Sequence, residues 1–225
     1  MTFFNDLLRT WPIFFQAALV TVQLTAVALA MGTAIGLVFA LLKISKNKLL
    51  IGIANGYITV IRGTPLIVQI FWIYYGLASV VDVGGFWAAI LALAVHNGAY
   101  IAEIFRGGIE SIDRGQMEAA RSLGMPYGLA MRRIILPQAF RRIVPPLGNQ
   151  FIIGLKDSSL AAFVTIEELF NISMRMASAT FRDIQYYTIA GLYYLALVVI
   201  FSFLVNKLEQ RLAAGSSGMV KGVGL

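Results

Sequence analysis

Long runs without a charged residue alternate with short basic segments along this chain of 225 residues. A helix needs about 20 mostly apolar residues to cross the hydrocarbon core of a bilayer. The pattern therefore predicts an all-α integral membrane protein with about five transmembrane helices. The predicted spans are 13–41, 63–81 with an extension back to 57, 83–102, 143–155 with an earlier start if the helix begins near Pro137, and 184–206.

The distribution of Lys and Arg predicts how these spans are oriented. Short cytoplasmic loops of membrane proteins are enriched in these two residues. In this chain they concentrate directly after the first span, in the long segment 104–142, and after the last span. We therefore expect these segments in the cytoplasm, with the N-terminus outside and the C-terminus cytoplasmic, as an odd number of crossings requires. The first apolar run is longer than the core of a signal peptide, so we expect a retained helix.

The same pattern predicts the domain organisation. We expect one transmembrane domain over 1–212, interrupted by a cytoplasmic loop at about 104–142. A tight turn around Asp82 is predicted between the second and third spans, because only a few residues separate them. The segment 213–225 is rich in Gly and Ser and is predicted to be flexible.

Composition agrees with a lipid environment. Apolar residues make up 59% of the chain, charged residues make up 13%, and the mean hydropathy is +0.78, whereas a soluble domain is about one quarter charged. The net charge of +7 comes from loops between apolar runs, so we expect no nucleic-acid partner. The sequence has no cysteine, which excludes disulfides and thiolate metal sites, and we predict no metal site.

The long segment between the third and fourth spans contains two predicted short helices. Residues 115–123 are rich in Ala, Glu, Met, Leu and Arg, which favour a helix. Gly124 suits the left-handed position that follows a helix, and Pro126 suits the first turn of the next one. We therefore predict a helix, a turn at Gly124 and a second helix on the cytoplasmic side.

The spacing within this segment resembles the E-A-A loop of ABC importer permeases. Glu118-Ala119-Ala120 is followed after three residues by Gly124, and Ile134 and Leu136-Pro137 complete the pattern. Further motifs resemble the polar amino acid subgroup of this family, in a resemblance that covers about 15–212. These motifs are Arg62-Gly63-Thr64-Pro65-Leu66, Tyr100 to Glu103, Leu136 to Ala139, and Lys156 to Leu160.

The resemblance implies a function for the first loop helix. In this family the corresponding helix docks into a cleft of a separate ATPase subunit. A small helix with Ala side chains can approach another surface closely, and charged residues can contact the rim of such a cleft. The alternative is a solvated amphipathic loop that only connects two spans. The residues expected to couple to the ATPase are Glu118, Ala119, Ala120, Arg121 and Gly124.

The resemblance also implies the partners. The sequence has no G-x-x-x-x-G-K-[ST] loop, so we expect neither ATP and Mg²⁺ nor any other cofactor in this chain, and we do not expect an enzyme. ATP-binding-cassette ATPase subunits are expected to hydrolyse ATP, and a second permease, identical or a sister chain, is expected to complete the path. An extracytoplasmic amino-acid-binding protein would deliver a polar amino acid. The complex is expected in the bacterial cytoplasmic membrane, where it would work by alternating access.

Polar residues inside the predicted spans mark a candidate substrate pathway, because such groups are costly in lipid. His96, Tyr100 and Glu103 are spaced so that they share one helix face. An amino acid substrate carries an ammonium and a carboxylate, so its site needs partners of both charges. The candidate pathway residues are Arg62, Gln69, His96, Asn97, Tyr100, Glu103, Lys156, Asp157 and Ser158.

Several of these residues also have a purely structural interpretation. Arg62 and Glu103 are expected to form an ion pair near the cytoplasmic ends of their helices. Lys156 and Asp157 would pair with each other or cap a break in the helix. His96 is equally well explained as a residue that forms a hydrogen bond between helices.

Three other functions remain compatible with the sequence alone. The first is a permease for another small solute, because such permeases share the loop. The second is a channel or gradient-driven carrier, which would be insensitive to changes at Glu118 or Gly124. The third is an integral membrane enzyme with a site at His96 and Glu103, which would act without ATP or partner subunits.

Overall fold

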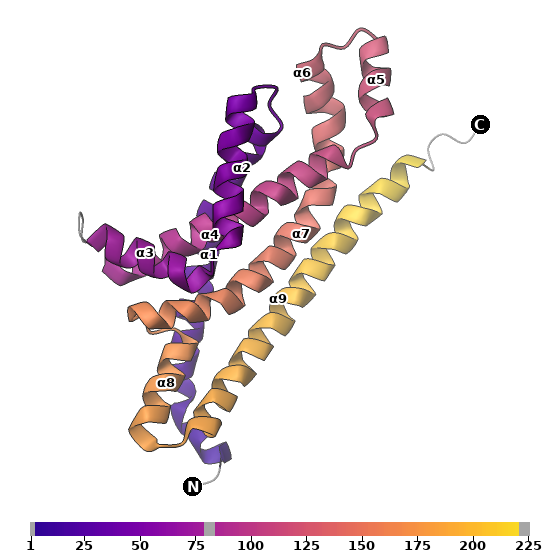
Figure 1. The fold of residues 1–225 in the computed structure, drawn as a ribbon. Coiled ribbons are helices and arrows are strands. Elements are labelled where there is room, and N and C mark those ends of the chain that lie inside the picture. Colours follow the sequence, from indigo (N-terminus) through magenta and orange to yellow (C-terminus); the bar gives the residue numbers. More distant parts are fainter. Residues whose placement is uncertain (1–2, 79–83, 221–225) are drawn as a thin grey trace.

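The computed structural model describes residues 3–78 and 84–220 (Figure 1). Every regular element within these residues is a helix, which confirms the all-α prediction for this part of the chain. The predicted turn around Asp82 lies outside the described residues. The elements are α1 (Phe3–Lys43), α2 (Lys48–Gly63), α3 (Leu66–Ala78), α4 (Gly84–Glu110), α5 (Arg114–Ser122), α6 (Tyr127–Ala130), the π-helix η1 (Met131–Ile135), α7 (Leu136–Asp157), the 3₁₀-helix η2 (Ser158–Val164), α8 (Leu169–Thr180) and α9 (Asp183–Val220).

Three of the described helices, α1, α4 and α9, are long and apolar enough to cross a membrane. The bent pair of α2 and α3 is a fourth if the two helices form one span. α7 has 22 residues but includes both a polar start and the charged pair Lys156 and Asp157 at its end. The chain is therefore an integral membrane protein, whereas five crossings and the orientation of the termini stay predictions.

The two ends of the bundle differ in what they contain. The start of α1 and the connection from α8 to α9 lie at one end, while the α5–α6 hairpin and the last turns of α9 extend toward the other (Figure 1). α9 continues through Val220, so the segment predicted to be flexible from 213 is helical as far as that residue. Extending an existing helix gains one hydrogen bond for each residue added, which favours this continuation.

The predicted second span is broken into two helices at Thr64-Pro65. α2 and α3 are bent by 107° at this point. A proline disfavours the helical conformation in the residue before it, and Thr64 is extended, with φ −119° and ψ 146°. A single continuous helix through 57–78 is therefore wrong.

α4 lies at the centre of the bundle and packs against α1 along small residues. Of its most apolar stretch 67% is buried, against 11% for α9. A Cβ atom added to Gly36 would lie 2.7 Å from the Cγ2 atom of Ile101, and one added to Gly32 would lie 3.0 Å from the backbone oxygen of Ala94. Small residues let membrane helices approach closely, and this contact fixes the side chains of α4 against α1.

The π-helix η1 joins the α5–α6 hairpin to α7. α7 begins at Leu136 and has Pro137 in its first turn, where the missing N–H of proline is not needed. This confirms the earlier start expected for the fourth predicted span. Pro145 and Pro146 lie inside α7.

Candidate functional site

The loop helix α5 and its turn form as predicted. α5 begins after Asp113, whose side chain accepts a hydrogen bond of 2.7 Å from a backbone N–H of the first turn. Gly124 follows the helix with a φ of +82°. Its N–H donates to the oxygen of Arg121 at 3.0 Å, and the N–H of Met125 donates to the oxygen of Ala120 at 3.1 Å. This pair of bonds closes a helix with a left-handed glycine, which confirms the predicted turn.

α5 presents one face to solvent and packs the other. Glu118, Ala119 and Arg121 are exposed, whereas Ala120 is only 2% exposed. Leu123, directly after the helix, is 84% exposed. The outward surface thus combines an acidic, a basic, a small and a large apolar side chain, and Ala120 supports it from beneath.

A packed cluster joins this hairpin to the end of α4 and the start of α7. Its buried members are Ile112, Ile135, Ala139 and Ile143. In addition, Arg142 donates a hydrogen bond to the backbone oxygen of Ser111, at the end of α4. We call residues 103–143 the docking unit, because this packed cluster joins the end of α4 to the hairpin and the start of α7.

A cleft of about 490 Å³ opens within the docking unit, between the end of α4, α5 and η1. It is lined by Ile109, Glu110, Ile112, Asp113, Arg114, Met117, Tyr127, Met131 and Ile135. The lining of the cleft thus mixes charged and apolar side chains.

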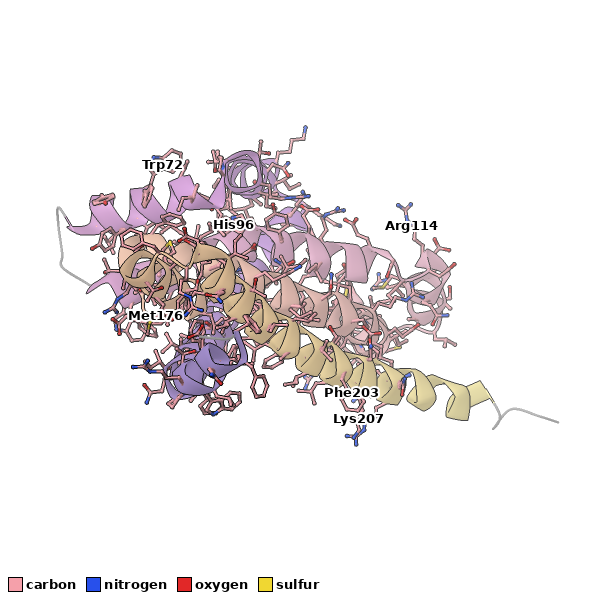
Figure 2. The ribbon with its side chains drawn as sticks, turned by 90° about the horizontal axis from the view of Figure 1, so that it is seen from below. Trp72, His96, Arg114, Met176, Phe203 and Lys207 are labelled. Carbon is pink, nitrogen blue, oxygen red and sulfur yellow. The ribbon has the colours of Figure 1, made fainter. Side chains whose placement is uncertain are left out.

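Four predicted pathway residues lie together where α2, α3 and α4 meet. Nδ1 of His96 donates to Oε1 of Gln69 at 3.0 Å. The guanidinium carbon of Arg62 lies 5.1 Å from the centre of the Tyr100 ring, within range of a cation–π contact. The rings of His96 and Tyr100 are also 5.1 Å apart. His96 thus lies among the helices, whereas Trp72 of α3 points away from them (Figure 2).

Gln69 also stabilises the break between α2 and α3. Its Nε2 atom lies 2.7 Å from the backbone oxygen of Ile61, and 3.1 and 2.8 Å from the backbone and side-chain oxygens of Thr64. These bonds satisfy carbonyls that the broken helix leaves without a partner. Gln69 and His96 therefore act together as a structural contact that joins α3 to α4.

Asn97 forms a second buried polar contact that the sequence did not predict in full. Its side-chain oxygen accepts a hydrogen bond of 2.8 Å from Gln150 of α7, and its amide donates to the oxygen of Leu93 at 2.7 Å. Asn97 and Gln150 are both buried. Gln150 was missed, although two adjacent amides, Asn149 and Gln150, within the apolar run 143–155 were the signal for it.

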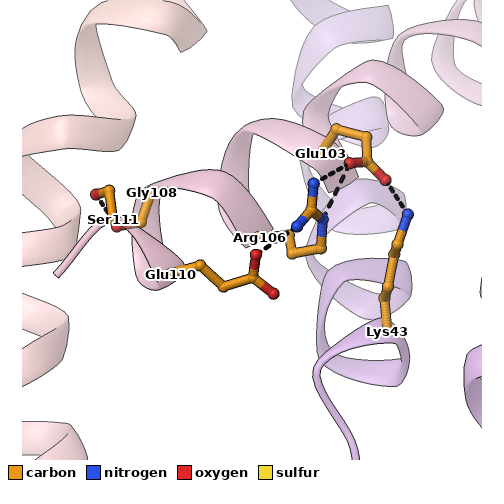
Figure 3. Close-up of polar contacts among 6 residues, drawn as sticks. All are labelled: Lys43, Glu103, Arg106, Gly108, Glu110 and Ser111. Carbon is orange, nitrogen blue, oxygen red and sulfur yellow. Dashed lines mark hydrogen bonds and ion pairs between the residues drawn. The ribbon is translucent and has the colours of Figure 1, made fainter. Parts of the chain in front are cut away.

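Glu103 forms ion pairs with Lys43 and Arg106 (Figure 3). Lys43 is the last residue of α1, and Arg106 is one turn along α4. Arg62 is instead held over Tyr100. The predicted pair of Arg62 and Glu103 is therefore wrong, because each has a nearer partner.

Lys156, Asp157 and Ser158 lie where α7 gives way to the 3₁₀-helix η2. Ser158 is buried and its hydroxyl donates to the oxygen of Leu155 at 2.8 Å. Lys156 is exposed and Asp157 is half-buried. Within the described residues no ion pair joins Lys156 to Asp157. The change from the α-helix α7 to the 3₁₀-helix η2 therefore depends on the backbone and on Ser158.

Two helices present polar stripes outward from the bundle. On α2 the stripe consists of Asn55, Thr59 and Arg62, spaced i, i+4 and i+7. On α7 the exposed residues Asn149 and Lys156 are spaced i and i+7. This spacing places each set on one helix face. Asn55, Thr59 and Asn149 were missed because uncharged polar residues stand out little in an apolar run.

At the opposite end of the bundle, Glu168 is fully buried. Its Oε1 atom accepts a hydrogen bond of 2.7 Å from the N–H of Asn171, at the start of α8. Its Oε2 atom accepts one of 2.5 Å from the hydroxyl of Tyr194 on α9. Burial raises the pKa of the Glu168 carboxyl to about 7. Glu168 therefore ties α8 to α9, a role that the sequence did not suggest.

Helices long and apolar enough to cross a membrane, with polar contacts buried between them, define an integral membrane protein. The chain matches the family model "Binding-protein-dependent transport system inner membrane component" over residues 32–214. It is 36% identical to the arginine transport system permease protein ArtQ of Bacillus subtilis strain 168 and 35% identical to the glutamine transport system permease protein GlnP of Escherichia coli K12. Each alignment covers 89% of this chain and 93% of the relative.

A solved structure described as an amino acid ABC transporter with histidines is similar as well, with a TM-score of 0.88 and 40% identity over 94% of this chain and 99% of that chain. The chain belongs to the family of binding-protein-dependent transport system inner membrane components. It is thus the permease subunit of an ABC importer, and in this class ATP hydrolysis belongs to a separate subunit. Alternating access coupled to that hydrolysis is general to the class.

Proposed function

We propose that this permease imports a polar amino acid across the bacterial cytoplasmic membrane. The observation that supports this most directly is the likeness, over about nine tenths of the chain, to permeases whose names specify arginine and glutamine. The solved amino acid transporter at 40% identity supports the same substrate class. An extracytoplasmic binding protein would deliver the amino acid to the outer end of the bundle.

We also infer the orientation of the chain, from the position of the docking unit. We infer that α7 forms the remaining crossing, so that five crossings place the N-terminus outside and the C-terminus in the cytoplasm. The α5–α6 hairpin and the last turns of α9 extend toward one end, and the start of α1 lies at the other, which supports this arrangement (Figure 1). The excess of Lys and Arg near the hairpin supports a cytoplasmic location for it.

We infer that the outward face of α5 contacts the ATPase. Glu118, Ala119, Arg121 and Gly124 would lie in the contact, with Ala120 beneath them. Their exposure and the fixed turn at Gly124 support this, because a preorganised surface loses little entropy on binding. The cleft beside α5 would accept a side chain of the ATPase.

We infer that the polar stripes of α2 and α7 line the substrate path. Arg62 and Lys156 would attract the carboxylate of the amino acid, and Asp157 would attract its ammonium. Tyr100, His96 and the other buried polar residues would position these groups from behind. The exposure of Arg62 and Lys156 supports this, because a charge that faced lipid would be costly.

The cost of exposing polar residues to lipid also supports a second permease subunit. Asn149 and Lys156 face outward from a single chain, so a second copy or a sister chain would cover them and enclose a wet path between the two. This arrangement leaves the apolar residues of α1 and α9, such as Phe203, for the lipid (Figure 2).

Uptake into liposomes tests the proposal. The permease is reconstituted with its ATPase and binding protein, and ATP-driven uptake of labelled arginine, glutamine and histidine is measured against a sugar and a dipeptide as controls. Saturable uptake of one of these amino acids that requires ATP supports the proposal. Uptake only of the sugar or dipeptide, or uptake driven by an ion gradient without ATP, would refute it.

A further inference from the structure

The cytoplasmic ends of α1 and α4 are joined by a network of charged side chains (Figure 3). Oε1 of Glu103 accepts from the ammonium of Lys43, and Oε2 accepts from Arg106 at 2.7 and 3.0 Å. Arg106 also donates to Glu110, one turn further along α4. Glu103, Arg106 and Glu110 therefore form a ladder along the last turns of α4, and Lys43 connects that ladder to α1.

The ladder belongs to the docking unit. Its helix continues directly into the cluster around Ile112, and Arg142 of α7 holds the end of α4 at Ser111. Any displacement of α5 therefore moves Glu103 and Arg106 with it, because packed interiors transmit displacement with little compression.

Lys43 is the last residue of α1, which forms a hairpin with α2 and packs against α4 at Gly32 and Gly36. The turn after Lys43 leads into α2, where the Asn47 side chain accepts a hydrogen bond of 2.9 Å from the N–H of Leu49 and starts the helix. α2 then carries Arg62, a residue of the outward polar stripe. Between this hairpin and the docking unit, the pair of Lys43 and Glu103 is the one ion pair among the described residues.

We propose that the pair of Lys43 and Glu103 transmits movement of the docking unit to the turn between α1 and α2 during transport. Lys43, Glu103 and Arg106 are positioning residues in this role and do not contact the substrate. The side chains of Lys43 and Glu103 are 22% and 19% exposed, so the pair is partly hydrated and contributes little net stability. A pair of this kind can stay intact during one half of the transport cycle, break during the other half, and form again afterwards. The inference rests on the proposed placement of α5 against the ATPase.

The test replaces Lys43 with Met in the complete reconstituted transporter. We expect the ATPase to remain active and stimulated by the loaded binding protein, while amino acid uptake per ATP falls about fivefold or more. The KM for the substrate should not change, because Lys43 does not contact it. Lys46→Met is the matched control, since Lys46 lies in the same turn and is exposed, and it should transport normally. Lys43→Arg keeps the charge and should restore most of the coupling.

A second variant, Glu103→Gln, removes the same contact from the other side and serves if Lys43→Met fails to assemble. Combining the two changes should reduce uptake per ATP no further than the more damaging single change, as expected for one shared contact. Unchanged uptake per ATP in both single variants overturns the inference, and so does a change confined to KM. If the unaltered transporter shows no ATP-driven amino acid uptake, the proposed function fails instead, so the two failures are distinguishable.

Discussion

Two glutamates of this permease, Glu103 and Glu168, are withdrawn from solvent in different ways. The side chain of Glu103 keeps 19% of its exposure and accepts hydrogen bonds from two cations, Lys43 and Arg106. Glu168 is fully buried, and its partners are the hydroxyl of Tyr194 and a backbone N–H. One carboxyl thus sits in a charged and partly hydrated network, and the other in an enclosed network without a cation.

The difference separates two tasks. A partly hydrated ion pair contributes little net stability, so it can break and re-form while the protein moves. A buried hydrogen-bonded group is costly to leave without a partner, at about 1–3 kcal/mol, so it holds its neighbours in one arrangement. We therefore expect changes near Glu103 to alter coupling and changes at Glu168 to alter stability.

The largest expected effect is that of Glu168→Ala. The change leaves the partly buried Tyr194 hydroxyl and N–H of Asn171 without their acceptor, at up to about 1–3 kcal/mol for each group. We expect a clearly lower midpoint of thermal unfolding for the purified protein in detergent. Glu167→Ala is the matched control, because Glu167 is 65% exposed in a surface pair with Arg175, and its effect should stay within about 0.5 kcal/mol. Equal midpoints of thermal unfolding for Glu168→Ala and Glu167→Ala would contradict a stabilising role for Glu168.

Gly124→Arg tests the proposed contact between α5 and the ATPase. An Arg at this position would have to adopt the φ of +82°, at about 1–2 kcal/mol, and would add a bulky cation to the outward surface of the docking unit. We expect uptake per ATP to fall on the order of tenfold, with a smaller loss of thermal stability than in Glu168→Ala. Gly124→Asn should stay coupled, because Asn tolerates the left-handed conformation. Normal coupling in the Arg variant would mean that α5 does not contact the ATPase.

Tyr100→Leu tests whether the proposed substrate path acts separately from the ion network around Glu103, one turn further along α4. It removes the ring beneath Arg62, a contact of about 0.5–2 kcal/mol, and leaves the pairs of Glu103 intact. We expect the KM for uptake to rise by about threefold, which is within that range, without a change in uptake per ATP. Tyr100→Phe keeps the ring and should behave as the unaltered protein does. A loss of coupling in Tyr100→Leu would show that the proposed substrate path and the ion pairs of Glu103 do not act separately.

The smallest expected effect is a pH dependence of stability. Burial raises the pKa of Glu168 from its ordinary 4.5 to about 7, so the folded protein holds this proton more tightly than the unfolded chain does. Its contribution to stability is therefore full below about pH 4.5 and is lost as the pH rises through about 7. We expect the difference in unfolding midpoint between the unaltered protein and Glu168→Gln to change between about pH 5 and about pH 8. A difference that is constant over this range would show that Glu168 does not titrate there.

Local signals explain which parts of the structure the sequence could predict. Gly124 and Pro126 define the hairpin within a few residues, so the docking unit was predictable. Contacts between distant segments were not, because they depend on how each helix is rotated: Lys43 and Glu103 are 60 residues apart, and Asn97 and Gln150 are 53 apart. The break at Pro65 had a local signal, but the apolar run on both sides of it favoured a continuous span.

The π-helix η1 affects how the α5–α6 hairpin is oriented relative to α7. Each residue of an α-helix turns the chain by about 100°, and η1 inserts a wider turn between α6 and α7. Removing one residue from Met131–Ile135 would therefore rotate the hairpin around the axis of α7 by roughly that angle. The wide turn thus sets the angle between the outward face of α5 and the polar stripe of α7. A deletion there would change that angle and leave every side chain on both surfaces unchanged.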